Sequence, residues 1–381
     1  MKDFNTGFTN KSYFHIIKSI VEGIYERNFD IRKFDFNFRD DSSINACADY
    51  DKQGNYDILK INTGTIIEIV ALMKTAFAQR NILSNFGNAN EEKNAIYTGE
   101  YVYRNNKHEL IFRTQNTIVD SCREQLSFYV ALMAIRFVFT HEVGHIVNGH
   151  TRLMNDLYMN SKIYMRMEKS NNIMQYCLDR RTLEMDADAA AATSSIDNIL
   201  ILYEQDKTGL EDMQIYSIEN LLELWGFSIA CVFLLFELNC RTNYDLKSYY
   251  LPNSARYILA IDAARQTLLS YKRNKVISYT IDVEMYDKAV TKGLIEAEKL
   301  FLLYSDDLTL SKDLFSNCEK FETFSKEVNE NWDKNLRERL KKYSRTVLFS
   351  EEETEQAVID MKKKEENILR RVIQQILKKV R

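Results

Sequence analysis

The chain has 381 residues, of which 45% are hydrophobic and 28% are charged, a composition that excludes disordered chains and low-complexity filaments. One proline and 11 glycines are too few for the frequent turns of a β-sandwich or barrel, so helices must dominate. A formal net charge of −4 argues against a nucleic-acid binder with a broad phosphate footprint. The six cysteines include no C-x-x-C pair and are typical of reduced thiols in a cytoplasmic protein.

The first third of the chain predicts a small sheet. Apolar residues at helical spacing predict a helix over 12–27, and alternating residues over 31–38 predict a half-buried strand. A second strand is expected over 56–62, followed by a helix that begins at Thr63. Aromatic and β-branched residues predict a hairpin between 96 and 118. Since helical patterns dominate after residue 120, we predict an α+β fold that is mostly helical.

Two features bear on the cellular location. Residues 1–6 lack the apolar stretch of a secretory signal, so we expect a cytoplasmic protein. The most apolar run, 224–236, has only thirteen residues between Glu223 and Glu237, whereas a membrane span needs about 20. This run is therefore predicted to be a buried core helix, and no membrane span is expected.

The most informative segment is Thr140–His150, which holds three of the five histidines. His141 and His145 are four residues apart, so on a helix they project from one face and can ligate Zn²⁺ together. Glu142 follows the first of them and can reach a water on the metal without being a ligand itself. That position suits a general base.

The helix that carries this motif has clear predicted ends. Ser121 and Glu124 match an S-x-x-E capping box, which predicts the start, and Gly149 predicts the stop. The residues between them are apolar nearly all round. We therefore expect a helix buried through the middle of the protein.

A catalytic zinc also needs a third protein ligand. Glu184 and Asp188 lie one helical turn apart, and the four alanines that follow would let their helix pack closely against the first. We predict Glu184 as the ligand and Asp188 as the acceptor of a ligand histidine's N–H, with Asp186 solvated on the opposite face. The alternative third ligand is His150, although its spacing departs from the metzincin pattern H-E-x-x-H-x-x-G-x-x-H.

The segments H-E-V-G-H-I-V-N-G-H and E-M-D-A-D together resemble the gluzincin zinc peptidases of the HtpX and CaaX-prenyl-protease type. They resemble most closely the soluble phage-exclusion Lit-like peptidases. The resemblance implies His141, His145 and Glu184 as zinc ligands, Glu142 as the catalytic glutamate and a zincin-like core. It also implies a role in antiphage defence, in which a host protein is cut upon infection.

Charge that develops on the scissile carbonyl oxygen needs a hydrogen-bond donor besides the metal. The peptidases that the chain resembles often carry a proline followed by an arginine, a pattern that Pro252 and Arg256 match. Arg256 is therefore the first catalytic candidate for this donor, and Tyr249 or Tyr250 is the second. A protein or peptide substrate is expected to pair with an edge strand, for which we predict Leu110–Ile118.

We divide the chain into a zincin-like metallopeptidase domain, 1–305, and a helical C-terminal extension, 306–381. The end of the extension, 350–381, carries apolar residues along one helical face, and 361–381 holds eight basic and two acidic residues. This basic amphipathic helix is predicted to pack on the acidic body or to bind a protein partner.

Together these observations predict a soluble zinc endopeptidase that hydrolyses a protein substrate through a zinc-bound water activated by Glu142. The first alternative is a zincin-fold regulatory or binding protein with a vestigial metal site. The second is a helical interaction protein in which the H-E-x-x-H motif arose by chance. Metal content and the effects of ligand substitutions distinguish the three.

Overall fold

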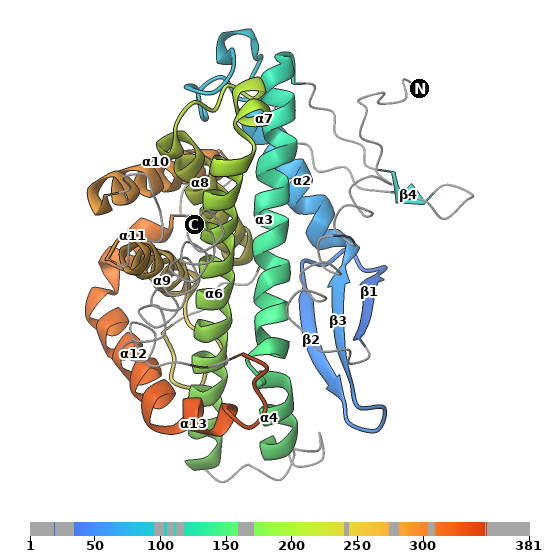
Figure 1. The fold of residues 1–381 in the computed structure, drawn as a ribbon, viewed down its shortest axis with the longest axis vertical. Helices are drawn as coiled ribbons and strands as arrows, with labels where there is room; N and C mark the ends of the chain where they lie inside the picture. Colours follow the sequence, from blue (N-terminus) through green and yellow to red (C-terminus); the bar gives the residue numbers. More distant parts are fainter. Residues whose placement is uncertain are drawn as a thin grey trace, which may run out of the picture.

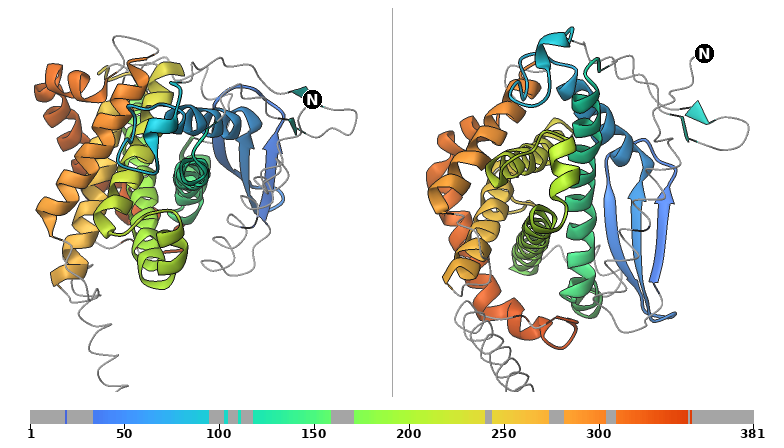
Figure 2. Two further views of the ribbon diagram at one scale, coloured as in Figure 1. Left: turned by 90° about the horizontal axis from the view of Figure 1, so that it is seen from above. Right: turned by 45° about the horizontal axis from the view of Figure 1, so that its top comes forward.

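A computed structural model of the chain describes residues 19, 34–94, 103–104, 110–111, 118–158, 171–239, 244–273, 282–303, 309–346 and 348. The described residues are mostly helical and include a small three-stranded sheet near the N-terminus, which confirms the α+β prediction. The central helix α3 (Ser121–Val147) lies between this sheet and most of the other helices (Figures 1 and 2).

The remaining helices are α2 (Thr63–Phe77), α4 (His150–Tyr158), α6 (Asn171–Gln205), α7 (Lys207–Asp212), α8 (Ile218–Asn239), α9 (Asn253–Arg273), α10 (Val283–Phe301), α11 (Leu310–Ser316), α12 (Cys318–Asn331) and α13 (Arg337–Leu340). A 3₁₀ turn covers Ala89–Glu91, and a π-helical turn covers Trp332–Leu336. The strands are β1 (Phe34–Arg39), β2 (Ala46–Asp51), β3 (Tyr56–Asn62), β4 (Tyr103–Arg104) and β5 (Leu110–Ile111).

The three-stranded sheet has the order β1-β3-β2, in which β3 pairs in parallel with β1 and antiparallel with β2. The predicted strand over 56–62 and the helix that starts at Thr63 are confirmed. The strand predicted over 31–38 begins, within the described residues, at Phe34. Strand β2 was not predicted, and it forms one edge of the sheet.

Two N-terminal predictions fall mainly outside the described residues. The helix over 12–27 is described only at Ser19, which is helical. Of the hairpin over 96–118, the structure describes β4 and β5, which pair antiparallel, and residue 118. The predicted hairpin pairing is therefore seen only at Tyr103–Arg104 with Leu110–Ile111.

The start of α3 differs by one residue from the prediction. Asp120 is the N-cap, and its side chain accepts a hydrogen bond from the Arg123 backbone N–H at 2.9 Å, so Ser121 is the first helical residue and not the cap. Aspartate caps helices as well as serine does, and the capping-box prediction was wrong for that reason. The Arg123 side chain, fully buried, donates to five backbone carbonyls between Phe77 and Phe86 and so fixes this end of α3 to the chain after α2.

Two helices, α3 and α8, are long and apolar enough to cross a membrane. However, 83% of the most apolar stretch of each is buried inside the protein. Core helices of soluble proteins pass the same test, so these helices are weak evidence for a membrane span. The run predicted as a core helix lies within α8, and its residues from Leu224 to Leu235 are buried.

The described part of the C-terminal extension is helical and packs on the body of the protein. Helix α11 contacts α9, α12 contacts α6, and α13 contacts α4. Beyond α13 the chain reaches the end of the central helix, where the Arg345 backbone N–H donates to the Val147 carbonyl at 2.8 Å. The predicted basic helix over 350–381 lies outside the described residues.

Candidate metal centre

Helices α3 and α6 approach closely where they carry the two sequence motifs. A Cβ atom added to Gly144 of α3 would lie 3.5 Å from the Ala187 Cα and 3.4 Å from the Ala190 Cβ of α6. Small residues on both helices therefore leave just enough room for ordinary contact. This packing is the reason that side chains on the facing turns can meet.

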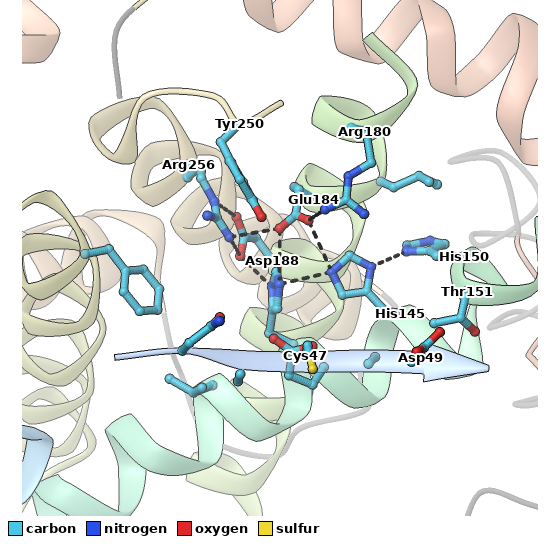
Figure 3. A pocket seen from close by; sticks show the side chains of 18 of the residues that line it. Cys47, Asp49, His145, His150, Thr151, Arg180, Glu184, Asp188, Tyr250 and Arg256 are labelled. Atoms are coloured by element: carbon cyan, nitrogen blue, oxygen red, sulfur yellow. Dashed lines mark hydrogen bonds and ion pairs between the residues drawn. The ribbon is translucent and has the colours of Figure 1, made fainter. Parts of the chain in front are cut away.

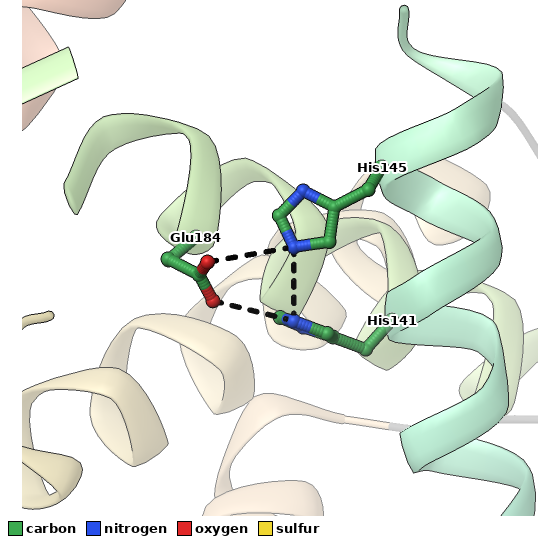
Figure 4. Close-up of side chains that lie close together, drawn as sticks. All are labelled: His141, His145 and Glu184. Carbon is green, nitrogen blue, oxygen red and sulfur yellow. Dashed lines mark hydrogen bonds and ion pairs between the residues drawn. The ribbon is translucent and has the colours of Figure 1, made fainter. Parts of the chain in front are cut away.

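The three predicted ligands lie together at this crossing (Figure 4). The Nε2 atoms of His141 and His145 are 3.1 Å apart, and the Glu184 carboxylate oxygens lie 3.4 Å from the former and 3.7 Å from the latter. A tetrahedral zinc site with bonds of 2.0–2.1 Å has ligand atoms roughly 3.3 Å apart. The buried group can therefore hold a metal ion, and its spacing fits a small tetrahedral one.

Behind His141 lies a buried pair of opposite charges. The His141 Nδ1 is 2.8 Å from a carboxylate oxygen of Asp188, which in turn binds Arg256 at 2.7 Å and 2.9 Å. Burial alone would lower the pKa of His141, but the Asp188 and Glu184 carboxylates together outweigh it and raise the pKa to about 10. Asp188 thus occupies the predicted position behind a ligand histidine.

Arg256 lies in the first turn of α9 and is buried. Its guanidinium faces the Asp188 carboxylate in a bidentate pair and lies 3.5 Å from Glu184. Its contacts in the described structure are thus to carboxylates that support the metal group. The predicted role as a donor to the substrate oxygen stays a prediction.

Behind His145 lies a second histidine. The Nδ1 atoms of His145 and His150 are 2.9 Å apart, and the His150 Nε2 is 3.0 Å from a carboxylate oxygen of Asp186. His150 therefore contacts the side of the His145 ring that faces away from the three-ligand group, and it is not a member of that group. Asp186 also accepts a hydrogen bond from the Asn148 side chain at 2.6 Å, so the prediction that it is solvated was wrong.

Glu142 is buried beside the ligands. Burial raises the pKa of its carboxyl to about 7, while a backbone hydrogen bond from Ala48 of β2 works in the opposite direction. A carboxyl with such a pKa can both accept and release a proton near neutral pH. The helix position after His141 thus gives Glu142 the environment of an acid–base group.

The site opens into a cavity of about 630 Å³ (Figure 3). One wall is formed by residues 44–49, and Figure 3 shows β2 running across the site with Cys47 and Asp49 on it. The opposite wall includes Arg180 and Tyr250, whose hydroxyl points toward Glu184 in the same view. Both walls carry polar groups that reach the space next to the ligands.

Of the two predicted tyrosines, Tyr250 lines the cavity, whereas Tyr249 packs edge-on against Tyr176. The nearby Glu184 carboxylate raises the pKa of Tyr250, so its hydroxyl stays protonated at neutral pH and can donate a hydrogen bond. Tyr250 is therefore the better placed of the two as a donor into the cavity.

Sequence analysis missed the strand that borders the site. Among the described residues, the edge strand at the cavity is β2. The predicted strand Leu110–Ile118 lies mostly outside the described residues, which include only 110, 111 and 118 of it. The sequence of β2, Ala-Cys-Ala-Asp-Tyr-Asp, has small and acidic residues in place of a clear apolar alternation, so it gave no strand signal. Arg180 was also missed, since a lone arginine on a long helix has no distinguishing pattern.

No protein-family model, curated protein or solved structure matches this chain.

Proposed function

We propose that this chain is a zinc-dependent endopeptidase of the gluzincin kind that cleaves a protein substrate in the cytoplasm. The observation that carries the proposal is the convergence of His141, His145 and Glu184 at the wall of a cavity into which Glu142 also faces. The two nitrogens and one carboxylate are a ligand set that zinc prefers in catalytic sites. The motif resemblance extends the proposal to antiphage defence.

The chemistry divides between the metal and the chain. His141, His145 and Glu184 would hold the zinc, which would supply a Lewis acid for the hydrolysis. Glu142, whose pKa is raised by burial to about 7, takes the proton of the attacking water and passes it to the leaving amine. Tyr250 or Arg256 donates to the carbonyl oxygen as negative charge develops there.

The edge strand β2 supplies a place for the substrate. Ala48 directs its backbone N–H at Glu142, away from β3, so this edge of the strand faces the cavity. An extended peptide that pairs with this edge would bring its backbone carbonyl next to the metal group. Ala46 and Ala48 are small, which leaves room for that backbone.

The proposal is tested by metal content and by one substitution. The purified parent chain should contain one zinc per chain, measured by plasma mass spectrometry. Glu142→Gln should keep that zinc but lower hydrolysis by about 10²–10⁴-fold, because an amide cannot accept the proton. Substrates are found as new N-termini in cells that express the parent against cells that express Glu142→Gln.

Glu124→Gln is the matched control, since it removes a carboxylate from the first turn of the same helix, outside the cavity. It should leave both zinc and hydrolysis unchanged. A parent chain with far less than one zinc would contradict the proposal and favour a regulatory protein with a vestigial metal site. Equal cleavage by the parent and Glu142→Gln would contradict the role of Glu142.

A further inference from the structure

A chain of polar side chains leads from His145 to the C-terminal extension. It passes from His145 to His150 at 2.9 Å, to Asp186 at 3.0 Å, to Asn148 at 2.6 Å and to the Thr346 hydroxyl at 3.1 Å. The inference drawn from it rests on the proposed metal centre.

The proton positions along this chain have one consistent assignment. His145 ligates a metal through Nε2 only if its proton is on Nδ1, so Nδ1 must donate, and the His150 Nδ1 must accept. The neutral His150 then carries its proton on Nε2, next to the acceptor oxygen of Asp186. A metal-ligating tautomer of His145 therefore requires an acceptor at the position of His150.

The side-chain amide of Asn148 links Asp186 to Thr346. Its Nδ2 donates to Asp186, and its Oδ1 accepts from the Thr346 hydroxyl, so both ends of the amide are satisfied in one orientation. The adjoining backbone is held as well, since the Val147 carbonyl accepts from the Arg345 N–H and from the Ser344 hydroxyl. The turn between α3 and α4 is thus tied to residues 344–346.

His150 and Asp186 have little contact with solvent, so the loss of either contact would be costly. His150 is 1% exposed and Asp186 has a side chain that is 15% exposed, so water does not easily replace either contact. A buried imidazole nitrogen without its partner carries a desolvation cost, which holds the His145 ring in the orientation that the pair allows. His150 lines the cavity, but its contact to the metal group in the described structure is through the His145 ring.

We propose that His150 is a positioning residue of the metal centre, that it orients His145 with the support of Asp186, and that residues 344–346 hold the outer end of this chain of contacts. Residues that orient a metal ligand affect metal affinity more than overall folding. The C-terminal extension is then part of the metal centre, although its described residues contribute no ligand.

The main test compares two substitutions of His150 in the full chain. Glutamine can accept from His145 through its Oε1 and donate to Asp186 through its Nε2, whereas leucine can do neither at a comparable size. His150→Leu should weaken zinc binding by about 10–100-fold, measured by competition with a chromophoric chelator, and His150→Gln should largely restore it. With cobalt(II) in place of zinc, the leucine variant should also change the visible absorption bands of the metal.

A second pair of variants tests the outer end and is mild enough to keep the fold. Thr346→Val removes the hydroxyl that donates to Asn148, while Thr346→Ser keeps it. The valine variant should weaken zinc binding by a few-fold, and the serine variant should match the parent. Urea unfolding of the metal-free chains checks that neither substitution acts through stability.

The results separate this inference from the proposed function. If the parent binds zinc tightly but His150→Leu and His150→Gln bind it as tightly as each other, the positioning role is refuted and the metal centre stands. The same holds if Thr346→Val and Thr346→Ser do not differ. If the parent itself binds no zinc, both the proposed function and the inference are overturned.

Discussion

The two histidines proposed as ligands are supported in different ways, although they lie one turn apart on the same helix. His141 is backed by an ion pair. Its Nδ1 lies 2.8 Å from the Asp188 carboxylate, which also binds Arg256. His145 is backed by the imidazole of His150, and the carboxylate of Asp186 lies behind that second ring. The difference teaches that one ligand is fixed by buried charge and the other by directional hydrogen bonds.

The two supports also depend on different parts of the chain. The support of His141 joins α6 to α9 inside the core, where each member is buried. The support of His145 runs through the turn after α3 and ends at residues 344–346 near the surface. We therefore expect the loss of a charged partner on the first side to lower stability more than substitutions on the second side.

The largest effect is expected on the charged side. Arg256→Met removes the bidentate partner of the buried Asp188 carboxylate and should lower the free energy of unfolding by about 3–5 kcal/mol. Urea denaturation of the metal-free chain measures this. Arg265 lies on α9 like Arg256 and pairs with Asp287 of α10 at the surface. Arg265→Met should lower the free energy of unfolding by less than about 1 kcal/mol. Equal losses in the two variants would contradict the comparison.

Metal affinity provides the next test of the charged side. Asp188→Asn keeps the size of the side chain but removes its charge, so zinc binding should weaken by about 10–100-fold. Asp197→Asn is the control, because it changes a carboxylate of the same helix that bonds to Tyr271 outside the cavity. Chelator competition should find its zinc affinity unchanged. A zinc affinity of Asp188→Asn equal to that of the parent would mean that the charge behind His141 is irrelevant.

A smaller effect on stability is expected at the turn between α3 and α4, which carries His150. Gly149 has a φ of +82°, and a Cβ there would lie 2.6 Å from the Tyr343 carbonyl carbon. Gly149→Ala should therefore cost about 1–3 kcal/mol of stability, measured by urea denaturation. Gly144 lies in the middle of α3, and a Cβ there would lie 3.4 Å or more from its neighbours on α6. Gly144→Ala should therefore change stability by less than about 1 kcal/mol. If both variants were equally stable, the turn would not be constrained.

The parts that could be predicted from sequence share a local cause. The spacing of His141 and His145 specifies one face of a helix, and Gly149 specifies its end, because both depend on residues within a turn or two. The alanines of α6 correctly indicated close packing against α3. The pairing of Glu184 with the histidines was predicted from its place one turn before Asp188 on an alanine-rich helix, and the motif resemblance implied the same ligand.

The parts that were missed depend on contacts between distant segments. Asp186 was expected in solvent because it faces away from Glu184, but the turn at Gly149 carries His150 back over that face. Nothing in the sequence links Thr346 to Asn148, which is almost two hundred residues earlier. Strand β2 forms because β3 and α3 cover it, not because its own residues favour a strand.

The contact between Arg345 and Val147 also has a consequence for the order of events during synthesis. The ribosome makes both ligand helices long before it reaches Arg345, whose N–H closes the open carbonyl end of α3. A nascent chain thus carries His141, His145 and Glu184 before the Val147 carbonyl at the end of α3 has its hydrogen bond from Arg345. Full assembly of the proposed metal centre therefore waits until translation has passed Arg345.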